Sequence, residues 1–124
     1  MPHLELNARL TIRPGTTEEF TAKVAEIVRL SQEGDTRTLR FDWFLSDDGT
    51  TCEVHEVYED GAAFFEHTQR IMPARAALFA ACVDGHAVSG FGDVPPQLVE
   101  MAEAHGGGIE QYTFLQGLQP APTV

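Results

Sequence analysis

The sequence predicts an α+β fold of the ferredoxin-like type, in which helices cover one face of an antiparallel sheet. Residues 4–12 and 38–46 each alternate apolar and polar side chains, as half-buried strands do. Apolar residues at helical spacing occupy the stretch between these segments. The predicted elements follow the order strand-helix-strand-strand-helix-strand, and this split βαβ pattern is typical of a ferredoxin-like layer.

The first strand is expected over residues 4–12, and the Arg-Pro-Gly segment at residues 13–15 ends it. Thr16 or Thr17 can cap the helix that follows. Two glutamates come next, in the first turn, where the helix dipole favours anions. Gly34 stands where a helix commonly ends.

A hairpin is expected next, with strands over residues 38–46 and 50–59. The Asp-Asp-Gly segment at residues 47–49 is a turn signal, because Asp and Gly tolerate the backbone conformations that such turns need. Phe44 and Val57 would face away from the helix-covered side of the sheet. A sheet that is apolar on both faces needs a second cover, and a second copy of the chain is the simplest one.

The second half of the chain is expected to begin with a helix over residues 62–70. Pro73 predicts a break at Met72 and a separate helix over residues 73–83. A fourth strand is expected over residues 86–91, after an Asp-Gly pair.

A helix from Pro96 to Ala104 and a last strand over residues 109–115 complete the predicted elements. No linker-like segment divides the chain, so we expect one domain. Its expected limits are residues 1–116, with a core over 4–92, a helix-strand extension over 93–116, and a tail over 117–124.

Composition excludes several classes of function. The chain has 124 residues, and 8 basic against 19 acidic side chains give a net charge of 8 − 19 = −11. Nucleic acids and anionic membranes need a basic footprint, so neither is an expected partner. The longest apolar-rich stretch, residues 74–83, is about half the length that spans a bilayer. Two cysteines thirty residues apart favour reduced thiols, and we expect a cytoplasmic protein.

Several segments together resemble antibiotic biosynthesis monooxygenase domains, over residues 4–92. They are Arg-Pro-Gly-Thr at 13–16, the strand 39–44, the turn 46–49, the strand 55–58 and the helix 60–67. The resemblance implies a dimeric α+β barrel with a small pocket between sheet and helices in each protomer. It also implies oxidation of a small aromatic, of the quinol or phenol type, by O2 without metal or flavin.

Three residues are candidates for catalysis. His67 should lie near the pocket-facing side of its helix and could accept a phenol proton. Glu56 and Tyr58 share a strand face, and Glu56 could orient His67 or anchor a substrate hydroxyl. Structural roles remain open for all three: a hydrogen bond from His67 to a neighbouring strand, an ion pair of Glu56 with a nearby arginine, and aromatic packing by Tyr58.

The candidate binding residues are mostly aromatic. They are Trp43, Phe41, Phe64, Phe65 and Asn7. The aromatic side chains could line a pocket for a flat ligand or simply fill the core. Asn7 faces away from the apolar side of the first strand, where it could orient a ligand carbonyl or face a dimer partner.

No metal or cofactor is expected. The Glu53-x-His55 pair lacks a third ligand at suitable spacing. Haem-degrading relatives use an Asn, a Trp and an axial His where this chain has Ala8, His67 and Ala77. The alternatives to an oxygenase are a ligand-binding or accessory protein without catalysis, and an isomerase or cyclase.

Overall fold

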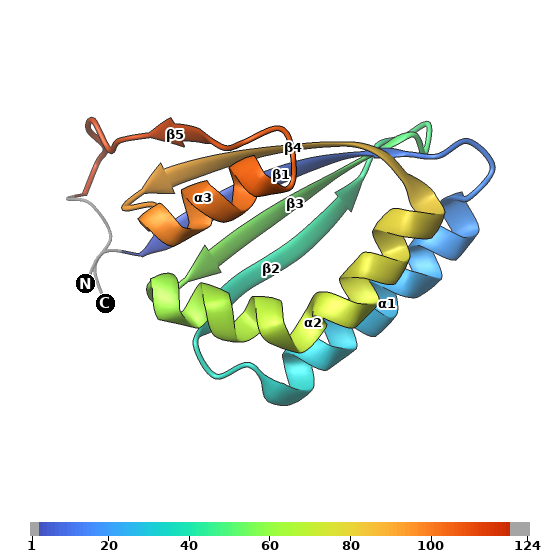
Figure 1. Cartoon of the computed structure of the whole chain (residues 1–124), viewed down its shortest axis with the longest axis horizontal. Coiled ribbons are helices and arrows are strands. Elements are labelled where there is room, and N and C mark those ends of the chain that lie inside the picture. The colour runs from blue at the N-terminus through green and yellow to red at the C-terminus, as the bar shows by residue number, and fades with distance from the viewer. Residues whose placement is uncertain (1–2, 120–124) are drawn as a thin grey trace.

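The chain folds as one sheet with three helices, as described by a computed structural model over residues 3–119 (Figure 1). The elements in chain order are β1 (Leu4–Ile12), α1 (Thr17–Gly34), β2 (Thr38–Leu45), β3 (Thr51–Tyr58), α2 (Gly61–Cys82), β4 (Val83–Gly92), α3 (Pro96–Ala104) and β5 (Glu110–Tyr112). The predicted tail begins within these residues, but positions 120–124 lie outside them.

The sheet has the strand order β2-β3-β1-β4-β5. The first four strands pair antiparallel, which confirms the ferredoxin-like prediction. β5 pairs parallel to β4, so the extension makes the sheet mixed. The expected last strand over residues 109–115 is too long, because only residues 110–112 form it and residues 113–119 pair with no strand.

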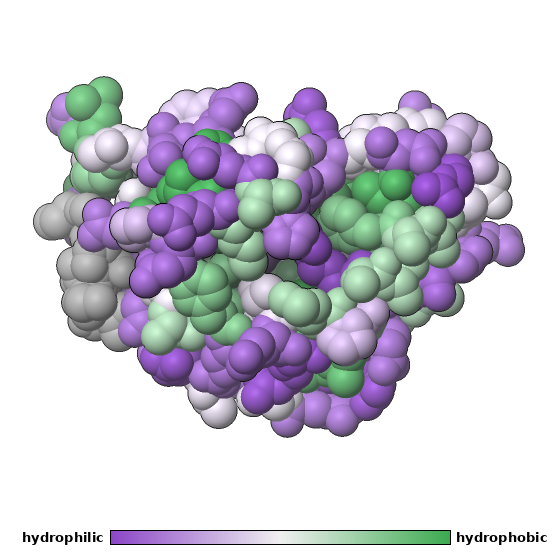
Figure 2. Space-filling view, in the orientation of Figure 1, coloured by the Kyte–Doolittle hydropathy of each residue, from purple (hydrophilic) through white to green (hydrophobic). Residues whose placement is uncertain are grey.

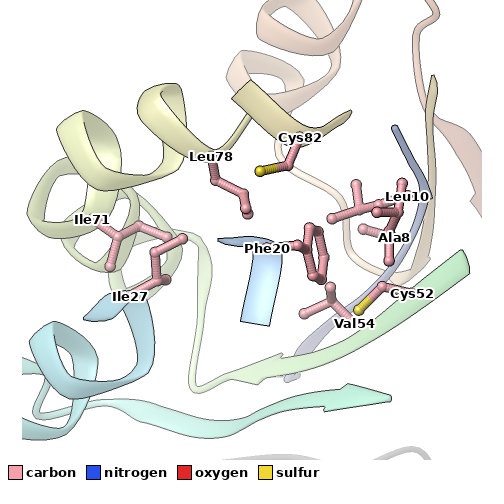
Figure 3. Close-up of a cluster of buried hydrophobic side chains, with 10 residues drawn as sticks. Ala8, Leu10, Phe20, Ile27, Cys52, Val54, Ile71, Leu78 and Cys82 are labelled. Atoms are coloured by element: carbon pink, nitrogen blue, oxygen red, sulfur yellow. The ribbon is translucent and has the colours of Figure 1, made fainter. Parts of the chain in front are cut away.

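The main core lies between the sheet and the two long helices. β1 alternates buried apolar residues with outward-facing ones along its whole length, as predicted. In Figure 3, Phe20 of α1 lies between Leu78 and Cys82 of α2 and the strand residues. A second cluster, built around Leu4, Tyr58, Phe64 and Leu98, joins α3 to the same face of the sheet. Both apolar clusters therefore lie on the same face of the sheet.

The predicted break at Met72 is wrong, because α2 runs without interruption through Pro73. A proline inside a helix removes one backbone hydrogen bond and costs about 3 kcal/mol. Ile71 and Leu78 are buried on either side of Pro73 and hold both halves against the core. Their packing offsets that local cost and keeps one continuous helix, which bends in its middle (Figure 1).

β4 begins three residues earlier than predicted, at Val83, directly after α2. The Arg13 guanidinium stabilises this junction by donating hydrogen bonds to the carbonyls of Ala80 and Ala81, at 3.0 Å each. It also forms an ion pair with Asp84, at 2.9 Å. The Asp-Gly pair therefore lies inside a strand and makes no turn.

All three helices lie on one face of the sheet, which we call the inner face (Figure 1). The outer face carries charged side chains together with Phe44, which is 47% exposed. Within residues 3–119, no helix combines the length and the apolar character that crossing a membrane requires.

Leu78 tests the core. We expect Leu78→Ala to lower the free energy of unfolding by about 2–5 kcal/mol, because a fully buried side chain leaves a cavity when truncated. Met72→Ala, on the same helix but 49% exposed, should change it by less than about 0.5 kcal/mol. Denaturant unfolding measures both values. Equal losses in the two variants would contradict this description of the core.

Candidate functional site

A cavity of about 530 Å³ lies between the inner face of the sheet, α2 and α3. Its wall is largely apolar, and the space-filling view shows a hollow near the middle of this side of the molecule (Figure 2). The polar and aromatic groups that border it include Phe41, Trp43, Glu56, Phe64, His67, Arg75 and His86. An apolar cavity with a few convergent polar groups is typical of a small-molecule site.

His67 projects from the first half of α2 and is 1% exposed. Its Nδ1 lies 2.6 Å from Oδ2 of Asp35, in the loop between α1 and β2. Phe41 packs edge-on against the imidazole, with ring centroids 4.4 Å apart. A carboxylate can only accept a hydrogen bond, so Nδ1 is assigned a proton, and in the neutral imidazole Nε2 is then the acceptor.

Asp35 is held by several donors at once. Ser31 donates to its Oδ2 at 2.5 Å, Thr38 donates at 2.9 Å, and Arg70 forms an ion pair with Oδ1. Burial alone would raise the pKa of Asp35, but these hydrogen bonds and the one to His67 outweigh it, so the pKa is lowered. Asp35 is therefore ionised at neutral pH.

Gly34 makes room for the Arg70 side chain. A Cβ at position 34 would lie 2.2 Å from Nε of Arg70. The glycine that ends α1 thus also admits the guanidinium that reaches Asp35.

Two residues of the cavity wall each have a buried polar atom without a hydrogen-bond partner within the described part of the chain. These atoms are Nε2 of His67, an acceptor in the tautomer above, and Nε1–H of Trp43, a donor. A buried polar group without a partner costs about 1–3 kcal/mol. A ligand with one donor and one acceptor would satisfy both atoms.

Glu56 enters the cavity from β3. Tyr58, two residues along the same strand face, donates its hydroxyl to Oε1 of Glu56. Burial raises the pKa of Glu56, and the hydrogen bond from Tyr58 lowers it only in part. Burial and the adjacent carboxyl raise the pKa of Tyr58 well above its ordinary value. The pair can therefore hold a proton that a ligand accepts or gives up.

The second half of α2 brings a cation to the cavity. The Arg75 guanidinium lies over the Phe79 ring, 4.2 Å from its centroid. Burial lowers the pKa of Arg75. His86 packs edge-on against the Phe79 ring, with ring centroids 5.0 Å apart. Partial burial and the nearby guanidinium lower the pKa of His86 to about 4, which keeps its ring neutral.

The structure brings most of the predicted site residues together. His67, Glu56, Phe41, Trp43 and Phe64 all border the cavity. The structure corrects the expected contact of Glu56 with His67. Asp35 binds Nδ1 of His67 instead, and Glu56 accepts the hydroxyl of Tyr58.

Three further candidates lie elsewhere. Tyr58 is fully buried behind Glu56. Phe65 packs against Phe64 and the second core cluster, outside the cavity wall. Asn7 lies on the outer face, opposite His55, because strand alternation turns it away from the cavity. Phe65 and Asn7 therefore do not line this site.

Sequence reasoning missed Asp35 and Arg75. Asp35 follows the glycine that ends a helix and resembles an ordinary loop residue. Arg75 could have been found, because His67 and Arg75 are eight residues apart and share one helix face. The predicted break at Met72 hid this relation. Within residues 3–119, no cluster of His, Cys, Asp and Glu has the geometry of a metal site.

Comparison with known proteins gives a family and a fold. The family model described as "Antibiotic biosynthesis monooxygenase" matches residues 4–84. No protein of curated function matches the sequence.

Solved structures share the fold at low identity. MupZ from Pseudomonas fluorescens has a TM-score of 0.77 and 16% identity, with all of both chains covered. PA3566 from Pseudomonas aeruginosa has a TM-score of 0.65 and 20% identity, covering 77% of this chain and 97% of its own. Rv0793 from Mycobacterium tuberculosis has a TM-score of 0.63 and 19% identity, covering 75% and 96%.

Asp35→Asn tests the charge beneath His67. At pH 7 we expect a loss of about 2–3 kcal/mol in the free energy of unfolding, because hydrogen bonds to a buried charge are lost. Since folding lowers the pKa of Asp35, its contribution is present above the unfolded value of about 4 and disappears as the pH falls through the folded value. The gap between wild type and variant should therefore close in acid.

Glu33→Gln is the matched control, since Glu33 pairs with Arg29 on the exposed side of α1, away from the sheet. It should cost less than about 1 kcal/mol. Denaturant unfolding at a series of pH values measures all three proteins. A gap that stays constant down to pH 2 would show that Asp35 is not the ionised partner of His67.

Proposed function

Because the chain belongs to the antibiotic biosynthesis monooxygenase family, we propose that its cavity oxidises a small aromatic of the phenol or quinol type. The oxidant is O2, and neither a metal nor a flavin takes part. An electron-rich phenolate can itself reduce O2, so the protein needs to supply a base, polar anchors and a dry, shaped cavity.

The observation that carries this proposal is the buried Asp35–His67 pair. Asp35 fixes the proton on Nδ1, so Nε2 of His67 is a base without a partner at the cavity wall. The imidazolium that forms after proton transfer is stabilised by the adjacent carboxylate. A phenol hydroxyl seated against Nε2 would supply the missing hydrogen bond.

The chemistry proceeds from that contact. His67 takes the phenol proton, and the phenolate passes one electron to O2, giving superoxide and a phenoxyl radical. These join through a new carbon–oxygen bond at an unsubstituted ring carbon ortho or para to the hydroxyl. The O–O bond then breaks. One oxygen stays on the ring as a carbonyl, and the other leaves as water with the hydrogen of that carbon and the proton held by His67.

Other groups position the substrate. Nε1–H of Trp43 is the unused donor that can bind a substrate or dioxygen oxygen. Phe41 and Phe64 form aromatic walls, and Glu56, held by Tyr58, is a second polar anchor.

An isomerase or cyclase is the second candidate. The raised pKa of Glu56 makes it a proton donor in the same cavity that holds the basic Nε2 of His67. Such an acid and base can move a proton between two positions of a substrate without O2. A pure binding protein would use the same walls without either transfer.

We also propose that two chains pair through their outer faces. Phe44 is exposed there beside His55, with ring centroids 4.8 Å apart, and Oδ1 of Asn7 has no hydrogen-bond partner within residues 3–119. Exposed apolar groups on an otherwise open sheet face favour a partner of the same kind. The free, buried thiols of Cys52 and Cys82 fit a protein that works in the reducing cytoplasm.

Oxygen uptake with a panel of phenols and quinols tests the reaction. We expect His67→Ala to slow the enzyme-dependent uptake by about 10²–10⁴-fold, the usual contribution of a positioned base. His3→Ala, outside the cavity, should match wild type, and thermal unfolding checks that both variants fold. An unchanged rate in His67→Ala removes the role given to His67. Turnover of a substrate without oxygen consumption would favour the isomerase.

Light scattering tests the pairing of chains. Two chains of 13.6 kDa give 2 × 13.6 = 27.2 kDa. We expect this mass for wild type, and a shift toward 13.6 kDa for Phe44→Asp, which would bury a charge at the interface. Thr21→Asp, on the exposed side of α1, should leave the mass unchanged. A wild-type mass near 13.6 kDa in dilute buffer rules the dimer out.

A further inference from the structure

Arg75 is the exception among the basic side chains. Of the eight lysines and arginines, seven form an ion pair with a carboxylate: Arg9, Arg13, Lys23, Arg29, Arg37, Arg40 and Arg70. Within residues 3–119, Arg75 neither forms an ion pair nor donates a hydrogen bond from its side chain. The chain carries 19 acidic residues, so a cation left without a carboxylate is not explained by a shortage of partners.

Partial burial makes the absence of a carboxylate partner for the Arg75 guanidinium energetically unfavourable. Its guanidinium lies against the Phe79 ring at the cavity wall and is half-buried. The acid nearest in the cavity, Glu56, already accepts the hydroxyl of Tyr58 and lies beyond ion-pair distance. Removing a charge from water without pairing it is unfavourable. A guanidinium with free donors and an aromatic platform is well suited to bind a planar anion.

We propose that the ligand of this cavity is an aromatic that carries a carboxylate, and that the carboxylate binds Arg75. The inference rests on the proposal that the cavity is the reactive site, and it adds the substrate class. The neutral His86 beside Phe79 contributes no second charge, so one anionic group suffices.

The spacing along α2 sets the size of this ligand. His67, Ile71, Arg75 and Phe79 follow one another at four-residue intervals, and all border the cavity. His67 and Arg75 are eight residues apart, which would be about 12 Å along a straight helix axis. α2 bends in its middle (Figure 1), which shortens the direct distance. Allowing for the reach of the arginine side chain, a fused two-ring aromatic fits between them. Its hydroxyl would contact Nε2 of His67, and its carboxylate would contact Arg75.

Calorimetric titration with two inert probes tests the inference without the oxidation step. The probes are 2-naphthoate and its neutral analogue 2-naphthamide, which share one ring system. We expect wild type to bind the acid about 10–100-fold more tightly, the usual gain from a charge-assisted hydrogen bond. Arg75→Gln should remove this preference and leave the amide affinity within about twofold, and Arg75→Lys should keep part of it.

Arg29→Gln is the matched control, because it removes the same charge from the exposed side of α1. It should bind both probes like wild type. Equal affinity of wild type for acid and amide, binding of neither, or a parallel loss of both in Arg75→Gln would each overturn the inference. The comparison within wild type does not depend on the folding of any variant.

The same probes separate this inference from the proposed reaction. If 2-naphthoate binds through Arg75 while no phenol or quinol consumes O2, the oxidation is wrong and the anion site stands. If quinols with and without a carboxylate consume O2 at equal kcat/KM, the oxidation stands and the anion site is wrong.

Discussion

The buried carboxylate of Asp35 joins the elements that build the site. It accepts hydrogen bonds from Ser31 at the end of α1, from Thr38 at the start of β2 and from His67 of α2. It also forms an ion pair with Arg70 of α2. An ionised group in the interior is tolerated only when it is well paired, so these contacts fix one another. The position of α2 on the sheet, and with it the direction of the imidazole, depends on this loop.

The two halves of α2 bring different chemical groups to the cavity, a base and a cation. The first half presents His67, whose proton is fixed by Asp35, and the second presents Arg75 against Phe79. Glu56 borders the same cavity from β3. A base at one end and a cation at the other match an aromatic that both loses a proton and carries a charge. Both side chains belong to one continuous helix because α2 runs through Pro73.

The sequence predicted much of the site by periodicity. Alternation along β3 placed Glu56 on the inner face, and the turn of α2 placed His67 near it. It could not predict that Asp35 would bind His67, because 32 residues separate them and loop conformation has no periodic signal. Arg75 was missed for a different reason. Pro73 predicted the end of a helix, which separated Arg75 from His67. The burial of Ile71 and Leu78 keeps the helix continuous instead.

By itself, the sequence determined the order of strands and helices, the inner face of each strand and the hairpin turn at Gly49, whose φ is +73°. These follow from short-range periodicity and backbone preference, which are written in neighbouring residues. Only the tertiary structure decided which groups face one another across the cavity, where β4 begins and whether α2 continues. Those outcomes depend on contacts between distant residues, whose packing and ion-pair energies exceed the local preferences that oppose them.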